Sequence, residues 1–156
     1  MTMILNSMTF TVGTFVSLLL ACVYAQQATQ GELLSQTCLG CICEAASGCN
    51  VTSGCVGEVC GPFRITWGYW ADGGKPTLNN EPNTVEGAYP RCVSDPYCAS
   101  RAVQGYMNKF GQDCNGDGVV NCDDYARIHR LGGYGCSGGL DVKYETSYKT
   151  CIQNFG

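Results

Sequence analysis

Cysteine is the feature of this 156-residue sequence that most restricts how the chain can fold. The chain carries 13 cysteines, and Cys22 alone lies before residue 26. An even number of cysteines in a short chain from an oxidising compartment is typical of a disulfide framework, in which each bridge contributes about 2–4 kcal/mol. We therefore expect about six disulfides. They would join Cys38, Cys41, Cys43, Cys49, Cys55, Cys60, Cys92, Cys98, Cys114, Cys122, Cys136 and Cys151.

The first 25 residues have the pattern of a secretory signal peptide. They contain no charged side chain, carry an apolar stretch from Phe10 to Val23, and end in the small residue Ala25. The stretch is short for a membrane span, so we expect cleavage after Ala25 and not a membrane anchor. Residues 26–156 then form one secreted, extracellular domain, which we expect to be a monomer without membrane contact.

Composition disfavours two kinds of partner. Cys38 and Cys41 have the spacing of zinc ligands, but the secretion signal and the other cysteines favour disulfides. The net charge of −4 at pH 7 gives no electrostatic attraction to nucleic acid. We therefore expect no nucleic-acid partner.

Hydrophobic spacing and turn residues predict a helix-dominated α+β domain. Alternating apolar and polar residues indicate a strand over Phe63–Trp67, with Gly73-Gly74 closing a hairpin after it. The polar stretch Thr77–Ala88 is expected to be an exposed loop. Helices are expected over Cys38–Cys49, Tyr97–Phe110 and Asp123–Leu131, with a short last helix around Tyr144 and Tyr148.

Four segments together resemble the invertebrate-type lysozymes of the destabilase family. They are Cys38–Cys49, Cys60–Pro76, Cys98–Gly111 and Cys114–Cys136. The resemblance implies a small lysozyme-like domain with a short β-hairpin, in which Cys43–Cys49 and Cys55–Cys60 are local bridges. It also implies bacterial cell-wall peptidoglycan as the partner and hydrolysis of its β-1,4 glycan bond as the reaction. Gly73 and Ala102 stand where the family has two cysteines, so one bridge is absent as a pair.

The resemblance also shows a departure at the catalytic position. Members that cleave peptidoglycan carry a glutamate before a Ser-Gly pair, and here that position is Ala46. A glycosidase needs a carboxylic acid to protonate the leaving oxygen, and a methyl group has no proton to donate. No catalytic residue of the family is therefore matched at this position.

Two other glutamates are the remaining candidates for an acid. The family's second carboxylate is an aspartate in a loop that is shortened here to four residues between Cys55 and Cys60, where Glu58 is the single acid. Glu44 lies two residues before Ala46, and residues two apart on a helix point to different faces. We therefore expect Glu44 to face away from the catalytic position.

By the same resemblance, the residues that form the wall of the substrate groove match the family better than the catalytic residues do. Aromatic side chains with a polar edge suit sugar binding, since they combine a large contact area with a hydrogen-bonding group. The alternative is that Trp67, Tyr69 and Trp70 fill the core, and that His129, the only histidine, is structural. The candidate binding residues are Thr66, Trp67, Tyr69, Trp70, Asp72, Tyr106, His129 and Arg130.

A separate twelve-residue stretch has the pattern of a calcium loop. Its ligands would be Asp113, Asn115, Asp117, the Val119 carbonyl, Asn121 and Asp124, with Gly118 at the turn. The alternative is that disulfides at Cys114 and Cys122 tie the loop without a metal. Hydrolysis needs no cofactor, so calcium would be structural.

Two functional classes follow from these residues. The first is a peptidoglycan hydrolase whose activity is weak or lost, and the second is a non-catalytic protein that binds bacterial glycan.

Asn50-Val51-Thr52 is also a sequon for N-glycosylation, in a turn beside cysteines.

Overall fold

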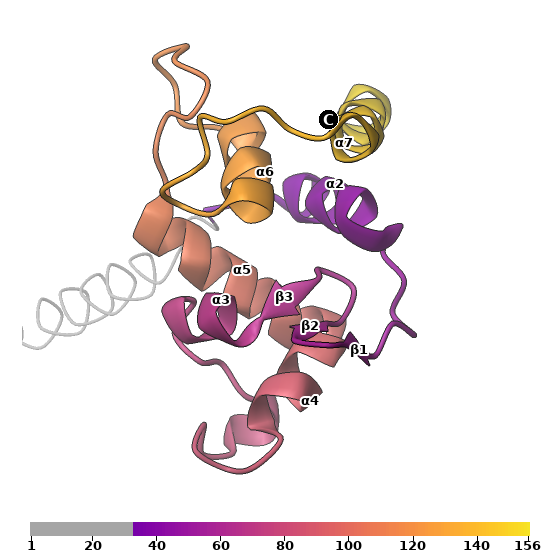
Figure 1. Cartoon of the computed structure of the whole chain (residues 1–156), viewed down its shortest axis with the longest axis vertical. Coiled ribbons are helices and arrows are strands. Elements are labelled where there is room, and N and C mark those ends of the chain that lie inside the picture. The colour runs from indigo at the N-terminus through magenta and orange to yellow at the C-terminus, as the bar shows by residue number, and fades with distance from the viewer. Residues whose placement is uncertain (1–32) are drawn as a thin grey trace, which may run out of the picture. The chain divides into compact units, whose positions relative to one another are not determined.

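Helices make up most of the computed structural model, and its strands form one small sheet (Figure 1). The structure describes residues 33–156, which form one unit, so the predicted signal peptide 1–25 lies outside the described residues. The helices are α2 (Gln36–Ser47), α3 (Trp67–Asp72), α4 (Ala88–Ser94), α5 (Pro96–Phe110), α6 (Cys122–Leu131) and α7 (Val142–Phe155), with a short 3-10 turn η1 (Leu78–Asn80). The strands are β1 (Cys55–Val56), β2 (Val59–Cys60) and β3 (Ile65–Thr66).

Four expected helices are confirmed, and their ends have local causes. The Asp95 side chain accepts a hydrogen bond from the Cys98 N–H at 2.7 Å, and Pro96 occupies the first turn of α5. Asn121 and Asp124 form a reciprocal capping box at the start of α6. The last helix is longer than expected, with 14 residues that begin after the cap Asp141.

The sheet differs from the prediction. Its three antiparallel strands are ordered β1-β2-β3, and the hairpin lies between Val56 and Val59 rather than at Gly73-Gly74. The expected strand is cut short because the Thr66 hydroxyl accepts a hydrogen bond from the Tyr69 N–H at 3.2 Å. This cap starts α3 at Trp67, so the chain coils where alternation predicted extension.

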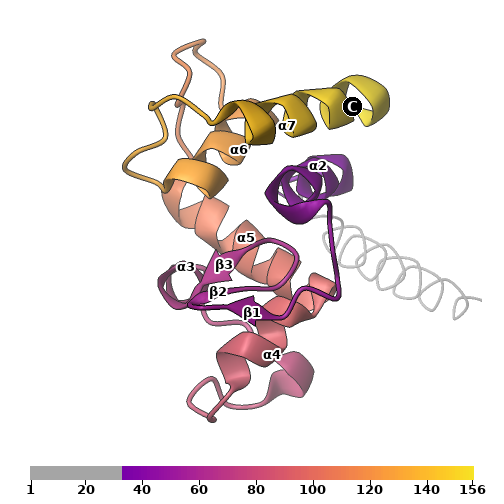
Figure 2. The same cartoon turned by 45° about the vertical axis from the view of Figure 1, so that its right-hand side comes forward.

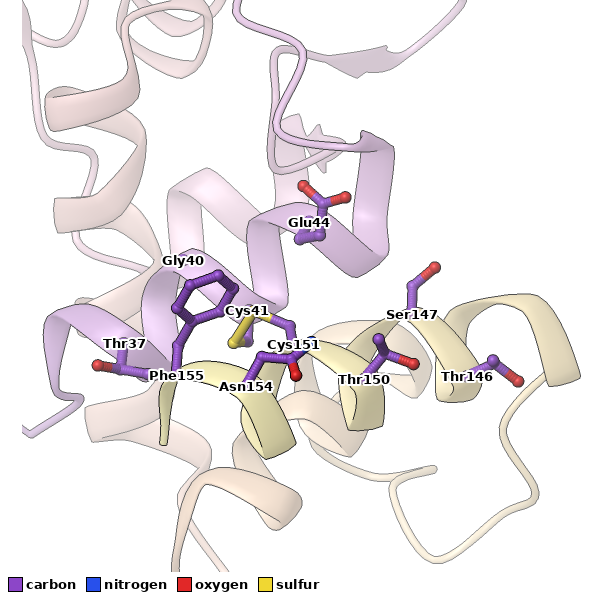
Figure 3. A pocket seen from close by; sticks show the side chains of 10 residues that line it. All are labelled: Thr37, Gly40, Cys41, Glu44, Thr146, Ser147, Thr150, Cys151, Asn154 and Phe155. Atoms are coloured by element: carbon purple, nitrogen blue, oxygen red, sulfur yellow. A yellow bond between two sulfur atoms is a disulfide. The ribbon is translucent and has the colours of Figure 1, made fainter.

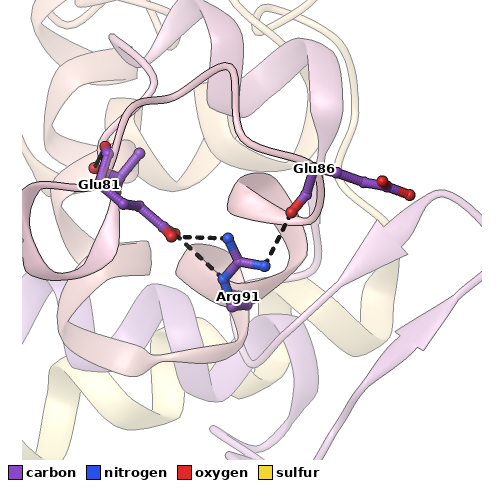
Figure 4. Close-up of polar contacts among 4 residues, drawn as sticks. Glu81, Glu86 and Arg91 are labelled. Atoms are coloured by element: carbon purple, nitrogen blue, oxygen red, sulfur yellow. Dashed lines mark hydrogen bonds and ion pairs between the residues drawn. The ribbon is translucent and has the colours of Figure 1, made fainter.

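The segment Thr77–Ala88, which was expected to be an exposed loop, is held by hydrogen bonds and an ion pair to helices α4 and α5. The Arg91 guanidinium binds the Glu81 carboxylate, with an Nη2–Oε2 distance of 2.8 Å, and donates to the Glu86 carbonyl at 3.0 Å (Figure 4). Thr77 is buried, and its carbonyl accepts from Arg101 at 2.6 Å. Helix α4, which the sequence analysis did not predict, follows this segment and buries Cys92 and Val93.

Six disulfides join the twelve described cysteines. Two of them connect α2 to later helices, because Cys38 pairs with Cys122 at the start of α6 and Cys41 pairs with Cys151 in α7. The remaining bridges are Cys43–Cys49, Cys55–Cys60, Cys92–Cys98 and Cys114–Cys136. Both local bridges implied by the resemblance are therefore present, and the predicted disulfide framework is confirmed.

Helix α5 runs through the middle of the described unit, with α2, α6 and α7 on one side and the sheet, α3 and α4 on the other (Figures 1 and 2). Its buried face includes Ala99, Val103 and Met107. Among residues 33–156, no helix is both long and apolar enough to cross a membrane. Residues 33–156 consist mainly of helices with one small three-stranded sheet, so the predicted α+β domain dominated by helices is confirmed.

Helices α3 and α5 meet through small residues. A Cβ atom on Gly73 would lie 2.3 Å from the Ala102 carbonyl oxygen, and one on Gly105 would lie 2.1 Å from the Gly73 carbonyl oxygen. The two backbones therefore touch directly at the place where the resembled family has a disulfide.

Candidate functional site

A cavity of about 270 Å³ lies where the two sides of the molecule meet. Residues from α2, the β3–α3 segment, α5, α6 and α7 line it, so it depends on the whole tertiary structure. The lining residues are Ala46, Phe63, Arg64, Thr66, Tyr69, Asp72, Tyr106, His129, Arg130, Gly132 and Tyr144. Six of the eight residues predicted to bind substrate are among them: Thr66, Tyr69, Asp72, Tyr106, His129 and Arg130.

A hydrogen-bonded stack of rings forms one wall of this cavity. The rings of Tyr69 and Tyr106 are parallel within 12°, with centroids 3.8 Å apart. The Tyr69 hydroxyl lies 3.0 Å from His129 Nδ1, and His129 Nε2 lies 2.8 Å from the Phe63 carbonyl oxygen. Because that carbonyl can only accept, Nε2 carries the proton, and Nδ1 accepts from Tyr69.

Burial keeps this wall uncharged. Desolvation lowers the pKa of His129 to about 4, and it raises the pKa of Tyr69 well above the usual value. Both side chains are therefore neutral near pH 7. Since both ring nitrogens of His129 are engaged, its role here is to hold Tyr69 and the Phe63 segment in place.

The two tryptophans are placed differently. Trp70 is buried, and its indole N–H donates to the Pro76 carbonyl at 2.8 Å, so it is a core residue and not part of the groove wall. Trp67 is 57% exposed and lines a neighbouring cavity of about 610 Å³ with Glu58, Gly68 and Tyr89. Thr66 lines both cavities, and we refer to the two cavities together as the groove.

The candidate acids do not meet in the cavity that contains Ala46. Glu44 lies on another face of α2, where it lines a cavity of about 540 Å³ between α2 and α7 (Figure 3). Glu58 is exposed in the neighbouring cavity, at the turn of the β1–β2 hairpin. Among the described residues that line the Ala46 cavity, Asp72 is the single carboxylate, and it binds the Lys109 ammonium at 2.5 Å.

Two arginines also line the Ala46 cavity. Arg130 is paired with Asp141, with an Nη2–Oδ2 distance of 2.7 Å, and lies over the Tyr144 ring. Arg64 was not among the predicted site residues. Its backbone is left-handed, with φ of 57°, and an alternating sequence pattern carries no signal for such a conformation.

In the predicted calcium loop, carboxylates accept hydrogen bonds from backbone N–H groups. Both carboxylate oxygens of the buried Asp124 accept backbone N–H bonds, from Cys114 at 2.8 Å and from Asn121 at 2.9 Å. Asp113 accepts from the N–H groups of Gly116 and Gly118, which lowers its pKa. In residues 33–156, no group of three or more His, Cys, Asp or Glu side chains is placed to hold a metal ion. The predicted ligand set also contains Asn side chains and a backbone carbonyl, so calcium binding by this loop stays a prediction.

The other predicted residues of this region lie at the surface. Asn50 is exposed, and its side-chain oxygen accepts from the Thr52 hydroxyl at 2.7 Å. Its glycosylation stays a prediction. Asn115 and Asp117 bond to each other, and the Val119 N–H donates to Asp117 at 2.9 Å.

Comparison with known proteins agrees with this geometry. Residues 35–151 match the family named Destabilase. The chain belongs to this family. It is 37% identical over 121 residues to invertebrate-type lysozyme 3 of Caenorhabditis elegans, covering 75% of this chain and 86% of that protein. It is 34% identical over 120 residues to a lysozyme of Meretrix lusoria, covering 73% of this chain and 87% of that protein.

Solved structures of destabilase relatives share the fold. An inhibitor-bound lysozyme from Meretrix lusoria has a TM-score of 0.60 at 31% identity, covering 77% of this chain and 92% of that one. The lysozyme of Tapes japonica has a TM-score of 0.57 at 27% identity, covering 82% of this chain and 96% of that one. The predicted lysozyme-like fold is therefore confirmed for this destabilase-family chain.

Proposed function

We propose that this protein is a secreted member of the invertebrate-type lysozymes that binds the glycan of bacterial peptidoglycan and hydrolyses it little or not at all. The observation that carries the proposal is the position of Ala46. This methyl group lines the groove in which the resemblance puts the family's acid. Six disulfides support secretion, because such bridges form and persist in oxidising compartments.

Cleavage of a β-1,4 glycan bond needs a proton donor and a second carboxylate about 5–5.5 Å away in a retaining enzyme. The groups beside Ala46 are poor donors. Asp72 accepts the hydrogen bond of the Lys109 ammonium, and His129 is neutral with both nitrogens engaged. General acid catalysis typically contributes about 10²–10⁴ in rate, so we expect turnover to fall by at least that factor.

Binding of sugar does not depend on the lost acid. The groove keeps the Tyr69–Tyr106 stack, the Thr66 hydroxyl and the exposed indole of Trp67. Aromatic faces beside hydroxyl groups bind sugar rings through contact area and hydrogen bonds. We therefore expect glycan to lie along the two cavities that share Thr66.

A residual hydrolase is the second candidate, and Glu58 is the observation that favours it. Glu58 lines one cavity with Trp67 and Thr66, and Thr66 also lines the cavity of Ala46. A glycan bound across both cavities would pass this carboxylate. Any hydrolysis by the unmodified protein would then depend on Glu58 and not on Glu44, which lines a different cavity.

The experiment combines a turbidity assay on purified bacterial cell walls with cosedimentation on insoluble peptidoglycan. We expect binding without clearing. Ala46→Glu alone should not restore full activity, because the second carboxylate is still displaced; the longer loop with its aspartate should be needed as well. Glu58→Gln and the matched control Glu44→Gln identify the acid if clearing occurs. Robust clearing by the unmodified protein would overturn the proposal, and so would failure to cosediment.

A further inference from the structure

An arginine to which the proposed function gives no role lies in the same cavity as Ala46. Arg64 is half-buried in the short connection between β2 and β3, and it lines the cavity together with Ala46 and Thr66. Its neighbours Phe63 and Ile65 are both buried. The connection is therefore anchored on both sides of Arg64, and its long side chain borders the groove.

The backbone at Arg64 has an unfavourable conformation for a side chain of this size. Its φ of 57° lies in the left-handed region, which non-glycine residues seldom adopt. The Arg64 N–H donates to the Gly61 carbonyl at 3.1 Å, which holds the turn in this form. Strained positions of this kind concentrate at binding sites, where the surrounding structure maintains them for function.

The charge of Arg64 is not neutralised inside the cavity. Asp72 is paired with Lys109, Arg130 is paired with Asp141, and His129 is neutral. For the Arg64 guanidinium, neither an ion pair nor a hydrogen bond occurs within residues 33–156. The cavity therefore keeps one positive charge without a described partner, and it is the same cavity in which the resemblance puts the family's glutamate.

We propose that Arg64 and the space left by Ala46 form a pocket for the carboxylate of an acidic sugar. The guest's carboxylate takes the place that a glutamate side chain fills in hydrolytic relatives. A guanidinium presents parallel N–H donors that match a carboxylate in a bidentate pair. This inference rests on the proposed function of the groove in binding glycan, and it names the substituent that the groove selects.

The test measures the affinity of the secreted, oxidised protein for three small probes by calorimetry. The disaccharide of N-acetylglucosamine and N-acetylmuramic acid carries a lactyl carboxylate, and N,N′-diacetylchitobiose is its neutral counterpart. Digalacturonate carries carboxylates on a different sugar. We expect the muramyl disaccharide to bind roughly tenfold more tightly than chitobiose, the usual range for a charge-assisted bidentate pair.

Three variants identify the source of that preference. Arg64→Gln should remove it, and Arg64→Lys should keep only part of it, because lysine retains the charge but not the planar fork. Arg64→Gly should remove the preference while raising the melting temperature, since glycine accepts a positive φ without strain. Lys143→Gln is the matched control, because Lys143 is exposed and lines none of the three cavities described above.

The outcomes separate this inference from the proposed function. Stronger binding of digalacturonate, lost in Arg64→Gln, would support the carboxylate pocket and indicate a uronic acid as its source. Equal affinity for muramyl and neutral probes in both wild type and Arg64→Gln would overturn the inference. If such a protein still cosedimented with peptidoglycan, the proposed function would stand without it.

Discussion

The half of the molecule that contains α2, α6 and α7 and the half that contains the sheet, α3 and α4 are cross-linked differently. In the helical half, Cys38–Cys122 and Cys41–Cys151 span 84 and 110 residues. In the sheet half, Cys55–Cys60 spans only 5 residues, and Cys92–Cys98, which joins α4 to α5, spans only 6. Long loops gain most from closure, so the comparison indicates where the stability of the fold lies.

The two halves also differ in which of them carries the residues that we propose to contact the glycan. Glu58, Arg64 and Trp67, on which our proposals depend, all lie on the sheet half. The helical half contributes Ala46 and the ring of His129, which is hydrogen-bonded on both sides. The long-range disulfides that hold α2 against α7 lie outside the sheet half. Surface residues of the sheet half can therefore be substituted without disturbing these bridges.

Removing one bridge from each half should give the largest difference. The double variant Cys41→Ala/Cys151→Ala should lose about 4–5 kcal/mol of unfolding free energy, whereas Cys55→Ala/Cys60→Ala should lose about 2 kcal/mol. The reason is the number of residues in each closed loop. Urea denaturation followed by circular dichroism measures both, and equal losses would contradict the assignment of stability to the helical half.

The two tryptophans should separate stability from binding within the sheet half. Trp70→Ala should cost about 3–5 kcal/mol, because it leaves a cavity in the core and removes the bond to Pro76. Trp67→Ala should change stability by less than about 0.5 kcal/mol and should weaken cosedimentation with peptidoglycan. A melting curve and a binding assay on both variants test this, and a stable Trp70→Ala protein would count against the buried placement.

Acid should destabilise the contact between the halves through His129. Its pKa is about 4 in the folded protein and 6.5 unperturbed, so the unfolded chain takes up a proton first as the pH falls. Its contribution, up to about 3 kcal/mol, is full above pH 6.5 and falls progressively as the pH drops toward 4.

Unfolding free energies measured in urea between pH 7 and pH 5 should therefore decline, and His129→Gln should flatten the decline. His129 is the only histidine, so carboxylates account for little of the change above pH 5. An unchanged slope in the variant would show that the buried imidazole is not the cause.

The loop predicted to bind calcium is held by hydrogen bonds to the Asp124 carboxylate. Asp124→Ala should cost about 2–3 kcal/mol, because it leaves the Cys114 and Asn121 N–H groups without their carboxylate acceptor. If the loop binds calcium as predicted, a chelator should lower the melting temperature of the unmodified protein, and added calcium should restore it. An unchanged melting temperature would show that the hydrogen bonds of Asp124 hold the loop without a metal.

Local signals in the sequence determined much of this protein. Asp95-Pro96 and the Asn121–Asp124 box started α5 and α6, because a helix cap is satisfied within three residues of chain. The even number of cysteines after residue 25 indicated the disulfide framework, and the spacing of residues 44 and 46 on a helix placed Glu44 and Ala46 on different faces.

The tertiary structure alone decided what depends on contacts between distant segments. It chose Cys151 as the partner of Cys41, turned Trp70 inward and Trp67 outward, and brought the Asp124 carboxylate to the Cys114 N–H. It also brought Arg64 to the cavity of Ala46. Periodicity and motif spacing describe only neighbours along the chain, whereas these outcomes are set by which surfaces of α2, α3 and α6 pack against one another.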